Sequence, residues 1–257
     1  MLASRFPRPA GRAAGIAGRA GDRTSAAYDG GVPEPTVDPV LAWRDAYDRV
    51  CALVERLDVA ELEVPVPACP EWTTRDLLAH MVGLGVDVLA GDEPDDHNSA
   101  WTQRQVDARR DRSAADLLAE WRGFADDLMA WMREHGSRPL NDVVIHEQDL
   151  RGAVGATGGR DSAGMWIVRN RMADRFSARL DALPPIALVS QEWTWCSRGE
   201  VSGAAVVLEA DAFDLARALT SRRTVDQLRA WARRGDVAPY LDAFAALGPL
   251  PAVPLPE

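Results

Sequence analysis

The hydrophobic positions in the first half of the chain repeat at helical spacing. From Trp43 onward, apolar residues recur every three or four positions, which predicts an amphipathic helix. Asp38 and Pro39 suit its N-cap and its first helical position, so the helix should begin there. The same spacing predicts three further helices, two of them opened by a capping box: Thr73 to about Ala90, Ser113 to Gly136, and about Asn141 to Val154. Four amphipathic helices with modest loops favour an antiparallel four-helix bundle.

The pattern changes after the glycine-rich segment 155–159. One more helix is expected over about residues 163–183, where Pro184 and Pro185 stop it. Short apolar runs then predict three strands: Ile186–Val189, Trp193–Cys196 and Ala204–Leu208. Two or three helices should follow, one of them opened by a capping box from Thr224 to Gln227. The expected fold class is α+β, with an N-terminal four-helix bundle over residues 38–160 and a small C-terminal α/β domain over residues 161–257.

Residues 1–37 differ in composition from the rest of the chain. They are rich in glycine, alanine, proline and arginine, and they lack the continuous apolar run of a secretory signal. Such a composition is typical of a disordered tail. A start codon assigned too early is the alternative explanation, and in both cases the segment adds nothing to the predicted fold.

Composition narrows the class of protein. All 29 basic residues are arginine, which indicates a GC-rich genome because lysine codons are AT-rich. The formal net charge of -10 argues against nucleic acid or an anionic membrane as the main partner. No apolar run approaches the roughly 20 residues that a transmembrane helix needs. The three cysteines are scattered and form no CxxC pair, so a reducing cytoplasm is the expected location.

Two of the four histidines are candidates for chemistry. His97 lies in an acidic loop and His135 at a helix end, so both are expected to be solvated. His80 lies near the apolar face of the second predicted helix, where a hydrogen-bonded core histidine is the commoner role. His146 follows Asp142 by four positions, which places an imidazole beside a carboxylate on one helix face.

The surroundings of the Asp142–His146 pair favour a buried site over a surface ion pair. The residues between them are Val143, Val144 and Ile145, which suit a buried helix better than an exposed one. Buried Asp and His side chains require partners. Helical bundles build metal sites from ligands on facing helices, and three protein ligands leave positions open for water or substrate. Asp149 is then either a residue that orients a ligand or a surface charge.

Three stretches resemble one known family. PACPEWTTRDLLAHMVG, residues 67–83, resembles the second-helix signature of the mycothiol-dependent maleylpyruvate isomerase family, which belongs to the DinB-like metal-binding bundles. NDVVIHEQDLRGAVG, residues 141–155, resembles the family's second ligand-bearing helix. LTSRRTVDQLRAWARRGDVAPYLDAF, residues 219–244, resembles its small sterol-carrier-like C-terminal domain. Together the resemblance covers about residues 38–250.

The resemblance implies an actinobacterial protein with a divalent metal, zinc foremost, on His80, Asp142 and His146. Well-described members carry a glutamate where this chain has Asp142. The family's reaction uses the small thiol mycothiol, whose thiolate adds to a conjugated double bond, allows rotation and leaves. The implied activity is thiol-assisted cis–trans isomerisation, or thiol transfer to a small electrophile, by a monomer or homodimer. The alternative is a non-catalytic metal-binding or ligand-binding protein on the same DinB-like scaffold.

The C-terminal resemblance also points to Arg222 and Arg223. Their guanidinium groups can hold the substrate's carboxylates or the polar end of mycothiol, and the C-terminal domain would then close over the metal. The alternative is a solvated turn. Cys69 can approach the metal or serve as a small buried hydrophobe. Trp72, Trp121 and Trp131 are expected in the core.

Overall fold

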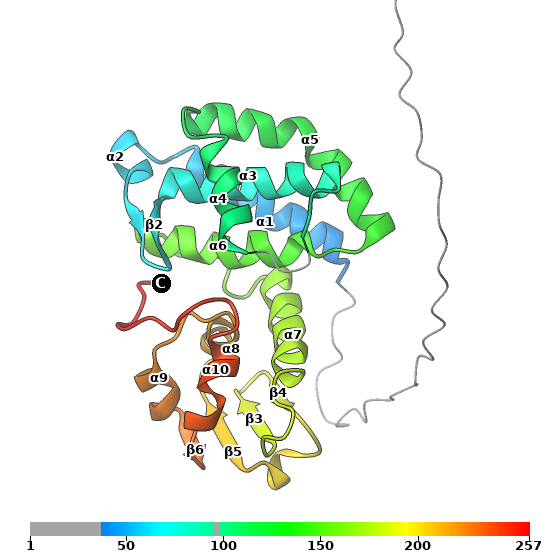
Figure 1. Ribbon diagram of the computed structural model, residues 1–257, viewed down its shortest axis with the longest axis vertical. Helices are drawn as coiled ribbons and strands as arrows, with labels where there is room; N and C mark the ends of the chain where they lie inside the picture. The colour runs from blue at the N-terminus through cyan, green and yellow to red at the C-terminus, as the bar shows by residue number, and fades with distance from the viewer. Residues whose placement is uncertain (1–36, 95–97) are drawn as a thin grey trace, which may run out of the picture. The chain divides into compact units, whose positions relative to one another are not determined.

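The computed structural model describes residues 37–94 and 98–257. The predicted tail, except for Val37, and His97 therefore lie outside the described residues. Val37–Glu257 form one unit by their internal contacts. Its fold is α+β, with a helical N-terminal part followed by an α/β part, as the sequence predicted at this level (Figure 1).

Long helices make up most of the N-terminal part. Their bounds are Pro39–Val54 (α1), Thr74–Ala90 (α3), Ala114–His135 (α5) and Pro139–Val154 (α6). The predicted N-cap at Asp38 and the capping boxes opened by Thr73 and Ser113 are all present. Helix α6 begins earlier than predicted, because Pro139 takes the first helical position. The helices pack on one another, and the stacked rings of Trp43 and Tyr47 on α1 meet the Trp121 ring of α5 edge to face.

Several short elements between these helices are not visible in the hydrophobic pattern. They are α2 (Val59–Leu62), β1 (Pro65–Val66), β2 (Cys69–Thr73) and α4 (Ser99–Asp107). Strands β1 and β2 pair antiparallel and place Cys69 and Trp72 just before α3. Helix α4 packs against α3, and the side chain of Asn98 caps it by accepting from the backbone N–H of Trp101.

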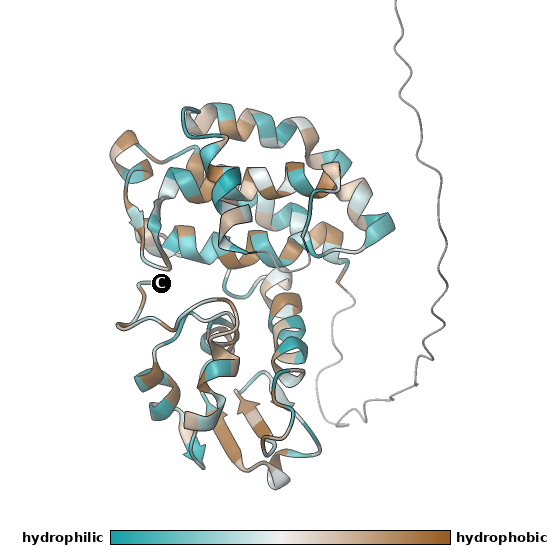
Figure 2. Cartoon of the chain, in the orientation of Figure 1, coloured by the Kyte–Doolittle hydropathy of each residue, from teal (hydrophilic) through white to brown (hydrophobic). Residues whose placement is uncertain are grey.

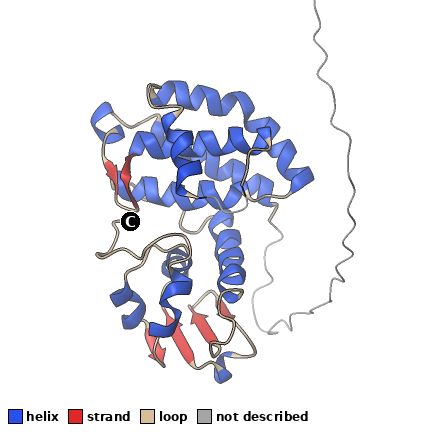
Figure 3. Ribbon diagram, viewed as in Figure 1, coloured by secondary structure: helices blue, strands red, loops and turns tan. Residues whose placement is uncertain are grey.

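The α/β part begins with helix α7 (Ala163–Ser177). This helix ends before the predicted limit of 183, since the following turn includes Asp181 with a φ of 29°, which a continuing right-handed helix does not contain. The sheet that follows has the strand order β4-β3-β5-β6 (Figure 3). Its strands are β3 (Ile186–Val189), β4 (Thr194–Cys196), β5 (Val206–Glu209) and β6 (Ala232–Arg234). Only the central pair, β3 and β5, is parallel.

Short helices complete the α/β part: α8 (Ala212–Leu219), α9 (Val225–Ala230) and α10 (Leu241–Phe244). The predicted capping box of Thr224 and Gln227 opens α9. Strands β3 and β5 carry hydrophobic side chains that are mostly buried (Figure 2). Helix α7 packs against α1, α6 and α8, so one hydrophobic core continues from the helices into the sheet. Among the described residues, no helix combines the length and apolar composition required to cross a bilayer.

Candidate metal centre

His80 lies on α3 with its ring held on both nitrogens. Its Nδ1 is 2.7 Å from Oε1 of Gln105, and its Nε2 is 3.2 Å from Oδ1 of Asp142. The Trp72 ring packs against it with centroids 5.0 Å apart. The side chain is only 4% exposed, so its orientation is fixed by the protein and not by solvent.

Asp142 and His146 lie one turn apart on α6, as their spacing predicted. His146 Nε2 is 3.4 Å from the same Asp142 Oδ1 that faces His80. The two imidazole rings meet edge to face, with centroids 5.0 Å apart and an interplanar angle of 86°. The structure thus brings the three predicted residues together, with one ligand atom from each within 4.8 Å of the others. Although aspartate is one methylene shorter than glutamate, the Asp142 carboxylate is long enough to reach both imidazoles.

The hydrogen bonds around the two rings decide which nitrogen carries the proton. The Gln105 amide nitrogen donates to Asp87 at 2.7 Å, which turns its carbonyl oxygen toward His80, and a carbonyl can only accept. His80 Nδ1 must therefore donate, and in the neutral ring Nε2 then carries the lone pair. His146 Nδ1 faces a carboxylate oxygen of Asp149 at 3.0 Å, so the same conclusion holds for its Nε2.

Two imidazole Nε2 atoms therefore converge on one carboxylate oxygen of Asp142. A cation bound between these atoms would stabilise the arrangement. Burial would lower the pKa of His80, but the Asp142 carboxylate and the bonds to Asp142 and Gln105 outweigh it and raise this pKa. The donor chemistry fits a divalent metal with three protein ligands and open positions.

Asp149 connects this centre to the α/β part. Its side chain is fully buried. Its carboxylate accepts from Arg217 at 2.6 Å and from Arg222 at 2.7 Å, and it also faces His146. Burial would raise the pKa of Asp149, but Arg222 and Arg217 hold that pKa well below its usual range. Of the two roles considered for Asp149, a surface charge is wrong, and the geometry is that of a residue that orients the His146 ring.

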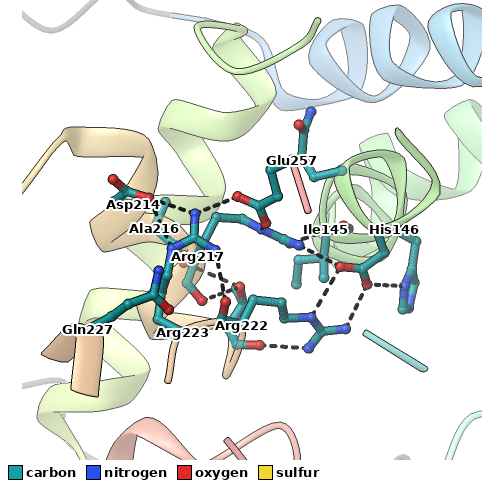
Figure 4. Close-up of polar contacts among 12 residues, drawn as sticks. Ile145, His146, Asp214, Ala216, Arg217, Arg222, Arg223, Gln227 and Glu257 are labelled. Atoms are coloured by element: carbon teal, nitrogen blue, oxygen red, sulfur yellow. Dashed lines mark hydrogen bonds and ion pairs between the residues drawn. The ribbon is translucent and has the colours of Figure 1, made fainter. Parts of the chain in front are cut away.

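Arg222 and Arg223 are buried, so the solvated turn considered as an alternative is wrong. Arg222 donates to Asp149 and to the backbone carbonyl of Thr220. Arg223 donates to Asp214 at 2.7 Å and to Glu257. Because Glu257 also accepts from Arg217, both predicted arginines belong to one network that ends at His146 (Figure 4).

Sequence reasoning missed two residues of this region, Arg217 and Gln105. Arg217 is 2% exposed and lies four residues after Phe213, on the buried face of α8. Gln105 is also 2% exposed and lies four residues after the buried Trp101 on α4. In both cases the available signal was a polar residue four positions, or about one helical turn, after a buried aromatic residue. Such residues are usually assigned to the solvated face.

A second group, Cys69, His146 and Asp149, also places its ligand atoms within 4.8 Å of one another. It suits a cation less well, because both oxygens of Asp149 already accept from buried guanidinium groups. Burial, with the nearby Asp149 carboxylate, raises the pKa of the Cys69 thiol to about 12. Cys69 is therefore a protonated, half-buried thiol beside the centre.

The remaining candidates lie where they were expected or close to it. His135 is exposed, with its Nδ1 3.0 Å from the Trp131 carbonyl of its own helix. Trp121 is buried in the core, and Trp72 and Trp131 pack against its edge. Trp72 also contacts the His80 ring, so it has a place beside the centre.

Residues 43–140 match the family profile described as the mycothiol maleylpyruvate isomerase N-terminal domain. The match includes His80 and ends just before Asp142 and His146. Comparisons with curated proteins and with solved structures gave no significant match. The match supports the resemblance of the helical N-terminal part to the mycothiol-dependent maleylpyruvate isomerase family over these residues.

Proposed function

We propose that this protein is a metal- and mycothiol-dependent enzyme that isomerises, or transfers a thiol to, a small electrophilic substrate. The metal would be held by His80, Asp142 and His146. The main support is the convergence of two imidazole Nε2 atoms on one oxygen of Asp142. Zinc is the metal we favour, although two imidazoles and a carboxylate also suit iron, manganese or nickel.

The proposed chemistry is a reversible thiol addition. A divalent cation at this centre would favour the thiolate form of a thiol whose ordinary pKa is about 8.5. The thiolate of mycothiol forms a bond to one carbon of a conjugated double bond, and the π-electron pair moves to the substrate carbonyl as an enolate. The former double bond rotates, the electron pair returns, and the carbon–sulfur bond breaks to release thiolate and the isomerised product.

The residues of the chain would position the partners of this reaction. His80 and His146 are held by Gln105 and Asp149 with their Nε2 atoms toward Asp142. Arg222 and Arg223 would provide the positive side of the site, which attracts the substrate's carboxylates or the polar end of mycothiol. Their present partners, Asp149, Asp214 and Glu257, would compete with such a ligand.

The cysteines support an external thiol as nucleophile. Burial raises the pKa of Cys69 to about 12 and also raises the pKa of Cys51. At neutral pH both are thiols rather than thiolates, and the thiolate is the nucleophilic form. Neither of these two side chains would supply a thiolate, which favours a cosubstrate as the source of the sulfur.

We assign α1, α3, α5 and α6 to a DinB-like four-helix bundle, with a division from the sterol-carrier-like α/β domain near residue 160. Two ligand-bearing helices that face each other, α3 and α6, support this assignment. A cytoplasmic location follows if mycothiol is the cosubstrate.

The first test measures metal content per chain in protein purified without chelator. We expect the wild type and His135→Ala to carry metal. His80→Ala, Asp142→Ala and His146→Ala should lose at least the roughly 10–100-fold in affinity that changes around metal ligands typically cause. Full metal content in the His80→Ala and His146→Ala proteins would reject the site.

The second measurement separates an enzyme from a binding protein. Turnover of maleylpyruvate is followed with and without mycothiol, in metal-loaded and in metal-free protein. Thiol-dependent turnover in the loaded protein alone supports the proposed enzyme. A loaded protein without turnover on maleylpyruvate or related conjugated acids would favour the non-catalytic alternative.

A further inference from the structure

Helix α4 delivers a single buried amide to the proposed metal centre. Gln105 is 2% exposed, and its two polar atoms have different partners. Its carbonyl oxygen is 2.7 Å from His80 Nδ1, and its amide nitrogen donates to Asp87 at 2.7 Å. His80 and Asp87 are both on α3, so Gln105 bridges two positions of the helix that carries the ligand.

The aspartate determines which way the amide points. A glutamine side chain can present either its oxygen or its nitrogen, but an ionised carboxylate only accepts. Asp87 therefore binds the amide nitrogen and leaves the oxygen for His80. The reversed amide would donate to Nδ1 and place the ring proton on Nε2, the atom that faces Asp142. Asp87 thus controls, through Gln105, whether His80 can act as a ligand.

A glycine makes this contact possible. A Cβ atom at Gly83 would lie 2.5 Å from Cβ of Gln105 and 2.9 Å from Nη1 of Arg109. Gly83 is three residues after His80, on the same side of α3. The close approach of α4 at Gly83 therefore brings Gln105 within reach of the His80 ring. Arg109, just beyond α4, pairs with Glu120 of α5 at 2.7 Å and holds this end of α4 in place.

We propose that Gln105, oriented by Asp87, is a positioning residue that fixes the tautomer and ring orientation of His80 for metal binding. The inference rests on the proposed metal site at His80, Asp142 and His146. It gives α4, an element the hydrophobic pattern does not predict, a role in the centre. Partners of ligand histidines typically contribute roughly 10–100-fold to metal affinity.

The test compares zinc affinity, measured by competition with a chromophoric chelator, in the wild type and in Gln105→Leu. Leucine is close to glutamine in size but lacks the amide, so we expect zinc to bind roughly 10–100-fold more weakly. The matched control is Gln148→Leu. Gln148 is equally buried, but its amide donates to the Gly158 carbonyl and not to a ligand, so its loss should leave zinc affinity unchanged.

A double variant tests the direction of the hydrogen bonds. In Asp87→Asn combined with Gln105→Glu, the carboxylate and the amide exchange places. His80 Nδ1 still donates, now to a carboxylate oxygen at position 105, and the new amide at position 87 donates to the other oxygen. We expect this protein to bind zinc about as tightly as the wild type. This double variant conserves polarity and size, so it still tests the role of Gln105 if Gln105→Leu does not fold.

The zinc affinities distinguish a wrong role for Gln105 from a wrong metal site. Unchanged zinc affinity in Gln105→Leu, with normal affinity in the wild type, overturns the role of Gln105 and leaves the metal site standing. A double variant that binds zinc much more weakly than the wild type also overturns that role. A wild type that binds no zinc or other divalent metal rejects the proposed function and this inference together.

Discussion

Asp149 is the single residue on which the centre and the arginine network both depend. It has no exposed side-chain surface, and its two oxygens accept from Arg217 and Arg222 while one of them faces His146. A buried carboxylate with these partners is ionised, and its charge balances part of two buried guanidinium charges. The residue therefore stabilises the fold and orients a proposed ligand at once.

Removing this carboxylate should cost much more stability than removing an equivalent one at the surface. Asp149→Ala leaves Arg217 with Glu257 as its one carboxylate partner and Arg222 with none, so we expect the free energy of unfolding to fall by about 3–5 kcal/mol. Urea denaturation of metal-free protein measures this loss without a contribution from bound metal.

Asp214→Ala is the matched control for Asp149→Ala. Asp214 is 37% exposed, and its partner Arg223 keeps Glu257 after the substitution, so we expect a loss of about 1 kcal/mol or less. Similar losses in the two variants would show that the network around Asp149 does not carry the stability assigned to it.

Helix α6 is the element that carries most of the centre. Besides Asp142 and His146 it contains Glu147, whose side chain is fully buried and accepts from Arg49 of α1 and from Arg151. One side of α6 is thus tied to α1 by an ion pair, while Asp149 is tied to α8 and the segment after it. These bonds fix the rotation of α6 about its axis, and with it the direction of both proposed ligands.

The end of α6 is fixed by close packing against segment 249–257. A Cβ atom at Gly152 would lie 2.3 Å from the backbone oxygen of Pro256, next to Glu257 of the arginine network. Gly152→Ala should therefore destabilise the protein by about 1–3 kcal/mol, the usual cost of overpacking, despite the better helix propensity of alanine. Urea denaturation is the measurement.

Gly123→Ala provides the comparison on an open helix face. Gly123 is exposed within α5, and a Cβ atom there meets nothing within 4 Å. The substitution should raise the free energy of unfolding by up to about 1 kcal/mol. If Gly152→Ala stabilises the protein as Gly123→Ala does, segment 249–257 is not packed against α6 in solution.

The elements that the sequence predicted share strong local signals. Helices α1, α3 and α5 have a capping residue or box and a long apolar stripe, so their starts could be read directly. Helix α4 was not predicted because it is short and most of its residues are polar, although Asn98 marks its start. Strand β6, Ala232–Arg234, has no apolar alternation because it is an exposed edge strand.

At the scale of the whole molecule, the centre draws on residues that are far apart in the sequence. The candidate ligands could be found because Asp142 and His146 are local neighbours and His80 lies in a family-like stretch. Arg217 could not be found in this way, because its partner Asp149 lies 68 positions away in the sequence. No residue pattern near Arg217 indicates that it pairs with a buried carboxylate. Local periodicity indicates on which face of its helix a residue lies. Whether a charged side chain can be buried there depends on a partner that only the tertiary fold brings close.

The separation of the ligands along the chain leads to a prediction for the stability of the entire unit. His80 on α3 and His146 on α6 approach each other only in the folded protein, so a metal bound to both should stabilise the native state over the unfolded chain. With free metal at about 100 times Kd the gain is about 2.7 kcal/mol. For a domain of this size, roughly 2–4 °C per kcal/mol gives a rise in Tm of roughly 5–10 °C.

Differential scanning calorimetry with and without zinc measures this shift, and single variants identify its origin. His135→Ala should keep the whole shift, because His135 is exposed and contacts its own helix. His80→Ala and His146→Ala should each lose most of it, because the first change removes α3 from the metal and the second leaves α6 with a single ligand, Asp142. If zinc raised Tm equally in all three variants, the metal would bind outside the α3–α6 centre, and the proposed ligand set would be wrong.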